Sequence, residues 1–295
     1  MSIPTTLVVS MSASLGGNIL RKHYANKASS GNLSVYIFNA ISSFAAAITF
    51  LVWGGFGDAS VFTLLLGALF GAVVMLQGLF FLKAMQIGPM SLTMVIVTFS
   101  TVITALSGAV FWGETIKILQ IVGIILMFAS FYFTVDKKQD EKSASLKWLV
   151  LCLLALIFFG GIGLMQKIHQ TSAYKLEINA FLTTAFIVGG ILSLIFTFAS
   201  KAKTNGAMFV KTETGSISWV VILIMVVAGV CTATNHKLNL YLSGVMDSAV
   251  FFPLINGGGL VLVTLSALVI FRERLTIKQW ISVALGIASV LCLCL

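Results

Sequence analysis

The most polar cluster inside any of the long apolar stretches of this sequence is Asn235-His236-Lys237-Leu238-Asn239. If His236 or Lys237 faces a cavity, it offers a positive or titratable group to an anionic or carboxylated molecule. The alternative is structural: Lys237 reaches the aqueous interface with its amine, and His236 hydrogen-bonds a neighbouring helix. The cluster indicates a binding site for a small polar molecule, and both interpretations stay open.

Amide side chains inside other apolar stretches are further candidates, because each amide presents donors and acceptors that must find partners. Trp219 is a second aromatic, after Tyr36, that could stack on a ligand. We leave Gln166 out because it lies near the end of its stretch. The predicted binding residues are Asn18, Tyr36, Asn39, Gln77, Asn179, Asn235, His236, Lys237 and Asn256.

The sequence does not indicate a catalytic or metal centre. His23, His169 and His236 are scattered, and no acid lies in the middle of an apolar stretch, whereas an enzyme needs a His/Glu pair or clustered carboxylates. The four cysteines have no metal-binding spacing. We therefore expect no enzymatic activity, no cofactor and no metal.

The composition is that of an integral membrane protein. Hydrophobic residues make up 59% of the chain and charged residues 9%, whereas soluble domains are roughly a quarter charged. Apolar runs of about 20 residues predict all-α membrane-spanning helices, which satisfy their own backbone groups. The ten predicted spans are about Ile3–Leu20, Leu33–Trp53, Ser60–Leu82, Met90–Trp112, Ile116–Val135, Leu146–Met165, Ile178–Phe198, Ile217–Tyr241, Ser248–Phe271 and Ile277–Leu295.

A short motif occurs twice, as FWGETIKILQ from Phe111 to Gln120 and as FRERLTIKQ from Phe271 to Gln279. In each copy an apolar run ends at an aromatic, a glutamate follows, and a second apolar run begins. The motif is typical of a tight turn between two spans. Glu114 and Glu273 lie just before a helix N-terminus, where negative charge is favoured. Helix capping is the simpler interpretation of the two glutamates, and substrate binding is the alternative.

The repeated motif and a polar linker divide the chain into two halves. We predict a first five-helix repeat at 1–135, a linker at 136–147 with the sequence DKKQDEKSASLK, and a second five-helix repeat at 148–295. An odd number of spans in each half predicts an inverted repeat. Pro253, Asn256 and Gly257-Gly258-Gly259 are expected to interrupt span nine, because proline removes a donor and glycine weakens a helix. A packing groove for a large neighbour is the alternative there.

The basic residues indicate the orientation. Of the 18 Lys and Arg residues, all but Lys117, Lys167, Lys175 and Lys237 lie in connections that share one face. The positive-inside bias predicts that this face is cytoplasmic and that both termini lie outside. The net charge of +9 therefore reports topology, and we expect no nucleic acid partner.

The pattern as a whole resembles the drug/metabolite transporter superfamily and, within it, the EamA-type ten-helix transporters. The resemblance is carried by Phe111-Trp112-Gly113-Glu114 with Gln120 and Gly123, by Phe271-Arg272-Glu273 with Gln279 and Gly286, and by Gly88-Pro89 before span four. It implies alternating access through a central cavity lined by spans one to four and six to nine, with spans five and ten outside. It also implies small substrates such as amino acids, nucleobases, nucleosides, sugars or drugs.

We therefore expect a secondary transporter of a small polar metabolite in the lipid bilayer of a bacterial cytoplasmic (inner) membrane, as a monomer or homodimer. Four-helix multidrug relatives carry a membrane-embedded glutamate in the first span, and this chain has no acid there. That departure favours facilitated diffusion or exchange over proton antiport. A multidrug or organic-cation efflux carrier, a lipid translocator and a non-transporting membrane subunit are the alternatives.

Overall fold

The computed structural model describes residues 2–27, 32–113, 117–134, 145–203, 219–246 and 248–294, and within these ranges it is helical without a strand. Glu114, Asp247 and most of the predicted linker lie outside the described residues. The α-helices of the described residues are α1 (Ile3–Lys27), α2 (Asn32–Gly54), α3 (Val61–Ile87), α4 (Met90–Thr98), α5 (Ser100–Trp112), α6 (Ile118–Thr134), α7 (Leu146–Thr171), α8 (Ile178–Lys203), α9 (Trp219–Val245), α10 (Ser248–Val269) and α11 (Ile277–Cys294).

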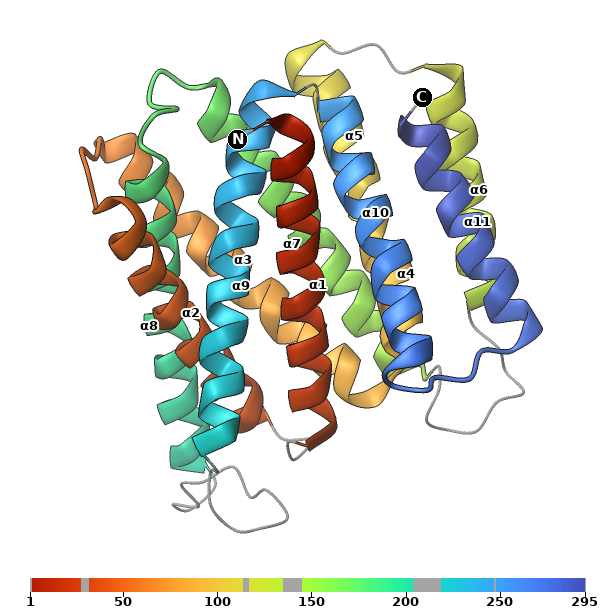
Figure 1. The fold of residues 1–295 in the computed structure, drawn as a ribbon, viewed down its shortest axis with the longest axis horizontal. Helices are drawn as coiled ribbons and strands as arrows, with labels where there is room; N and C mark the ends of the chain where they lie inside the picture. Colours follow the sequence, from red (N-terminus) through yellow and green to blue (C-terminus); the bar gives the residue numbers. More distant parts are fainter. Residues whose placement is uncertain are drawn as a thin grey trace.

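The helices run up and down between two ends of the molecule, and both chain termini lie at the same end (Figure 1). Seven segments among the described residues are long and apolar enough to cross a membrane. They are Ile3–Asn26, Leu33–Gly54, Val61–Ile87, Met90–Trp112, Leu146–Thr171, Ile178–Ser200 and Trp219–Val245. The protein is therefore an all-α, multi-pass membrane protein.

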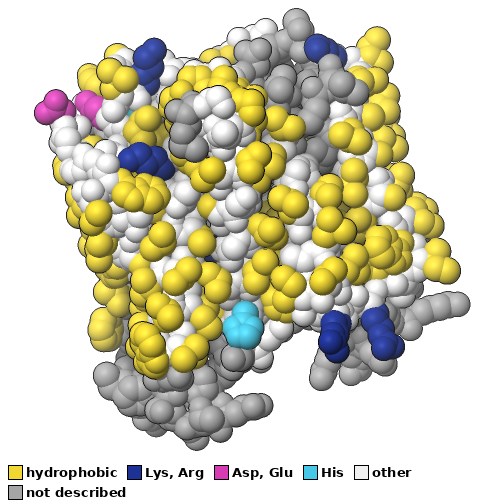
Figure 2. All heavy atoms as spheres, in the orientation of Figure 1, with side chains coloured by type: hydrophobic (Ala, Val, Ile, Leu, Met, Phe, Trp, Pro, Cys, Tyr) yellow, Lys and Arg dark blue, Asp and Glu magenta, His cyan; other side chains and the backbone are white. Residues whose placement is uncertain are grey.

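The outer surface agrees with a lipid environment. Large apolar side chains are exposed around the helices, including Val52 at 78% and Val110 at 76% of their full area. Figure 2 shows hydrophobic groups over most of the visible face, with basic groups near both its upper and lower edges and acidic groups at its upper left. An apolar surface of this extent is stable against lipid and not against water.

The first helix is longer than its sequence predicts. We expected span one to end at Leu20, but α1 continues through Arg21 and Lys22 to Lys27. Both basic residues therefore belong to a helix and not to the loop in which the orientation argument counted them. The helix continues because polar partners inside the protein receive the charge: the Lys22 amine donates to the carbonyl oxygens of Met85 (3.0 Å) and Gly88 (2.9 Å).

The expected interruption of span nine is wrong. The backbone of α10 is helical from Ser248 to Val269, through Pro253 and the three glycines. Pro253 removes only one N–H from the helix, and a backbone in hydrocarbon has few partners other than its own helix, so the remaining groups keep the helical pattern. The break falls instead in span four, at Phe99, which separates α4 from α5. The Phe99 N–H donates to the carbonyl oxygen of Ile96 (3.2 Å), three residues back, instead of continuing the α-helical pattern.

The helices of the two halves interleave. Helix α1 contacts α9, α3 contacts α7 and α8, α2 contacts α8, and α6 contacts α11. Small residues allow the closest approaches. A Cβ atom on Gly71 of α3 would overlap the backbone carbonyl group of Ala185 in α8. The core that positions the site is thus built between the halves rather than within each one.

Candidate functional site

A cavity of about 130 Å³ lies between the two halves of the chain. Its lining comes from α1, α3, α4, α5, α7, α9 and α10. Its hydrogen-bonding side chains are Ser14, Asn18, Arg21, Gln77, Thr98, Ser100, Thr104, Gln166, Thr232, Asn235, His236, Asn239 and Asn256. Among the described residues, no Asp or Glu lines the cavity, so it offers hydrogen bonds and positive charge but no carboxylate.

Five of the predicted binding residues meet at this cavity: Asn18, Gln77, Asn235, His236 and Asn256. They come from α1, α3, α9 and α10. Asn256 also donates from Nδ2 to Oγ1 of Thr101 in α5 (2.7 Å), which ties the last described cavity helix to the first half.

The other four predicted residues lie elsewhere. Tyr36 stacks on Phe196 of α8 with ring centroids 5.5 Å apart, and Asn39 packs against Gly78 of α3. Asn179 and Lys237 line a separate pocket. Trp219 is 71% exposed. Helices α2 and α8, expected to line the cavity as spans two and seven, supply none of its described lining residues.

A hydrogen-bond chain joins α1 to α9 at the cavity wall. Ser10 donates its hydroxyl to Oδ1 of Asn239 (2.6 Å). Asn235 donates from Nδ2 to the hydroxyl of Ser10 (3.1 Å), and Asn239 donates to Oδ1 of Asn235 (3.3 Å). These amides hold the two helices together, so part of the predicted polar cluster is structural.

Three other amide side chains that line the cavity are buried. Asn18, Gln77 and Gln166 are 7%, 3% and 3% exposed, and Nε2 of Gln77 has no hydrogen-bond partner among the described residues. A buried amide group without a partner is costly, so the Gln77 side chain is suited to a polar ligand. Gln166 was left out of the prediction because it lies near the end of its apolar run, but α7 continues past it to Thr171.

His236 and Lys237 separate. The ring of His236 lies between Phe70 (5.8 Å between centroids) and Phe186 (5.2 Å), and its Nδ1 has no partner among the described residues. The amine of Lys237 lies 5.6 Å from the ring centroid of Trp53. The structural interpretation therefore fits Lys237, whereas His236 contributes to the cavity wall.

Arg21 is the cavity residue that the sequence prediction missed. It lines the cavity and donates from Nη2 to Oγ1 of Thr232 in α9 (3.1 Å). A signal was present, because Arg21 lies three residues after Asn18 and seven after Ser14, on the same face of a helix. Arg21 is counted in the sequence only as a basic residue of a connection, and its position on the same helix face as Asn18 is not used there.

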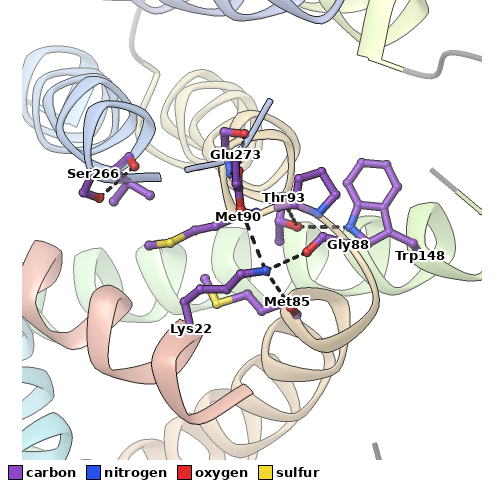
Figure 3. Close-up of polar contacts among 11 residues, drawn as sticks. Lys22, Met85, Gly88, Met90, Thr93, Trp148, Ser266 and Glu273 are labelled. Carbon is purple, nitrogen blue, oxygen red and sulfur yellow. Dashed lines mark hydrogen bonds and ion pairs between the residues drawn. The ribbon is translucent and has the colours of Figure 1, made fainter. Parts of the chain in front are cut away.

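Polar contacts close the structure at the end where α1 finishes (Figure 3). The Glu273 carboxylate accepts hydrogen bonds from the N–H groups of Met90 (2.6 Å) and Ser91 (3.1 Å), and lies 3.8 Å from the amine of Lys22. The predicted capping role is present, but the capped helix is α4 and not the helix that follows Glu273. The turn brings the carboxylate to α4 because the second half folds against the first.

A second pocket of about 560 Å³ lies at the opposite end, beside the start of α1. Its lining includes Asp58, Glu177, Asn179 and Lys237. Glu177 accepts hydrogen bonds from the N–H (2.9 Å) and the hydroxyl (2.8 Å) of Ser60, the N-cap residue of α3. Hydrogen bonds from Thr63 and Ser60 hold the pKa of Glu177 below its usual value. At this end too, an acidic residue of the second half, Glu177, contacts the N-terminus of a helix of the first half, α3.

Comparisons with known proteins agree with this architecture. Residues 7–136 match the EamA-like transporter family, which confirms the resemblance found in the sequence. No curated protein matches the chain. The chain is similar to a solved structure described as "Crystal structure of protein", at 13% identity over 99% of this chain and 96% of that chain, with a TM-score of 0.63. That likeness shows the fold alone.

Proposed function

We propose, from the match of residues 7–136 to the EamA-like transporter family, that this protein is a secondary transporter of a small polar metabolite. Its ten spans form two inverted five-helix repeats, and these move around the central cavity to expose it to either side of the cytoplasmic membrane in turn. The cytoplasmic face is the basic one, so both termini lie outside.

The helix contacts support the inverted repeat. Such a repeat pairs α1 with α7, α2 with α8, α3 with α9, and α4–α5 with α10. Under this exchange the α1–α9 contact becomes the α3–α7 contact, and the α2–α9 contact becomes the α3–α8 contact. The α2–α8 and α6–α11 contacts exchange with themselves. All these contacts are present, as a two-fold axis in the membrane plane requires.

The observation that carries the proposal is the polar cavity between the halves. Asn18 and Gln77 reach it from the first half, and Gln166 and Asn256 from the second. Because a ligand held there touches both halves, its binding energy depends on their relative position. A ligand that favours one arrangement shifts the population of states toward it.

The size of the cavity favours a metabolite over a drug. Pockets for drug-sized ligands measure roughly 300–1,000 Å³, and this cavity is about 130 Å³. The Glu273 contacts close one end. A small cavity with polar contacts across one end of the bundle is compatible with an occluded step of alternating access, and its size disfavours the multidrug alternative.

The test is transport by the full-length protein reconstituted in proteoliposomes, with radiolabelled amino acids, nucleosides and sugars offered singly and in exchange. We expect uptake of at least one solute, and its loss in Asn18→Ala and Asn256→Ala. Asn179→Ala is the matched control, since Asn179 lines the other pocket. If no solute crosses the membrane, the proposed transport function is wrong. If both cavity variants transport normally, the assigned binding site is wrong.

A further inference from the structure

We infer that the transported solute is a small monoanion, of the carboxylate class, whose charge is held by Arg21. This inference rests on the proposed function and names the substrate class of the same cavity. It starts from the charge balance of the cavity wall, which the family match leaves open.

Arg21 is the one Lys or Arg among the residues that line the cavity. An arginine stays protonated in proteins and carries five N–H donors. Only the bond to the Thr232 hydroxyl engages its guanidinium among the described residues. The guanidinium therefore keeps most of its donors and the whole of its charge for another partner.

No described carboxylate neutralises Arg21. Of the described acids, Asp58 and Glu177 line the second pocket, and Glu273 lies next to Lys22. An unpaired charge within a membrane protein is costly and usually marks a functional partner. A carboxylate is the matching partner, because the guanidinium fork binds its two oxygens side by side.

The surroundings favour one negative charge and a polar body. A single cation compensates a single anion, and a cavity of about 130 Å³ holds few atoms beyond a carboxylate and a short polar chain. The buried amides of Asn18, Gln77 and Gln166 line the same cavity and can bind that remainder.

The experiment compares carboxylates with their neutral amides by thermal shift of the purified full-length protein. L-lactate against L-lactamide, glycolate against glycolamide and pyruvate against pyruvamide are the probe pairs. We expect at least one carboxylate to raise the melting temperature while its amide does not. Arg21→Gln should weaken that binding at least about tenfold, because a charged hydrogen bond is lost. Arg21→Lys, which keeps the charge, should retain part of it.

Arg274→Gln is the control, since it removes an arginine that is exposed outside the cavity, and it should respond as the wild type does. The inference is overturned if amides stabilise as well as carboxylates, if no carboxylate in the panel stabilises the wild type, or if Arg21→Gln binds unchanged. Transport of a neutral solute in proteoliposomes would overturn the anion inference and leave the transporter proposal standing. Carboxylate binding without transport of any solute would overturn the transporter proposal and leave the anion site standing.

Discussion

Glu273 and Ser91 come from different halves of the chain, yet Oε2 of the glutamate accepts both the backbone N–H (3.1 Å) and the hydroxyl (2.7 Å) of the serine. The same carboxylate accepts the N–H of Met90 through Oε1 (2.6 Å). The first turn of α4 therefore has its donors satisfied by a loop far away in the sequence. This contact joins the turn after α10 to the start of α4, at the end where the cavity is closed.

Replacing Glu273 with alanine should destabilise the protein, because it leaves the first N–H groups of α4 without their acceptor and removes the ion pair with Lys22. We expect a loss of about 2 kcal/mol, the size of a strong helix cap or a charged hydrogen bond. The measurement is the melting temperature of the purified variant. The melting temperature of Glu273→Gln, which keeps one acceptor oxygen, should lie between those of the wild type and Glu273→Ala. Arg274→Ala changes an exposed neighbour and should melt with the wild type; if Glu273→Ala does too, the contact contributes nothing.

Gly71 should tolerate no side chain. A Cβ atom there would overlap the backbone carbonyl of Ala185 and force α3 and α8 apart. We expect Gly71→Ala to cost about 1–3 kcal/mol, as overpacking does, and to lower the yield of folded protein on size-exclusion chromatography. Gly161→Ala is the matched control, because a Cβ there meets only Val73 at 3.5 Å, an ordinary contact. Equal yields of the two variants would contradict the assigned packing.

Acid should weaken the contact between Glu177 and Ser60. Since hydrogen bonds from Thr63 and Ser60 lower the pKa of Glu177, its contribution to stability is fully present above the unfolded pKa. The contribution is lost as the pH falls through the folded pKa, which lies below the usual 4.5. Melting curves from pH 7 to pH 3 should show wild type above Glu177→Gln at neutral pH and converging with it in acid. Lys175→Gln, in the same loop, should follow the wild type; a gap that persists at the lowest pH would argue against this role.

Both termini should be accessible from outside the cell. Short epitope tags added at either end are expected to bind antibody on intact cells, whereas a tag inserted in the linker at 136–147 should need permeabilised cells. The reason is the excess of Lys and Arg at the end opposite the termini. Labelling of the linker and not of the termini on intact cells would reverse the orientation but not the fold.

Much of this architecture follows from the sequence alone. The positions of the helices are a local property, since an apolar run of about 20 residues in lipid must satisfy its own backbone as a helix. The repeated glutamate motif and the polar linker at the midpoint indicate two related halves, because a repeat and a linker are patterns of the sequence itself. The amides at Asn18, Gln77, Asn235 and Asn256 could be picked out because a buried amide needs partners wherever it lies.

Only the tertiary structure decided which polar residues share a cavity. Asn39 and Asn18 look alike in sequence, but α2 turns Asn39 toward Gly78 while α1 turns Asn18 to the cavity. Arg21 became a site residue because α9 places Thr232 beside it and because α1 continues past Leu20. Glu273 caps α4 rather than its own helix because the halves interlock. These facts depend on how helices far apart in the chain pack, which hydropathy and spacing do not record.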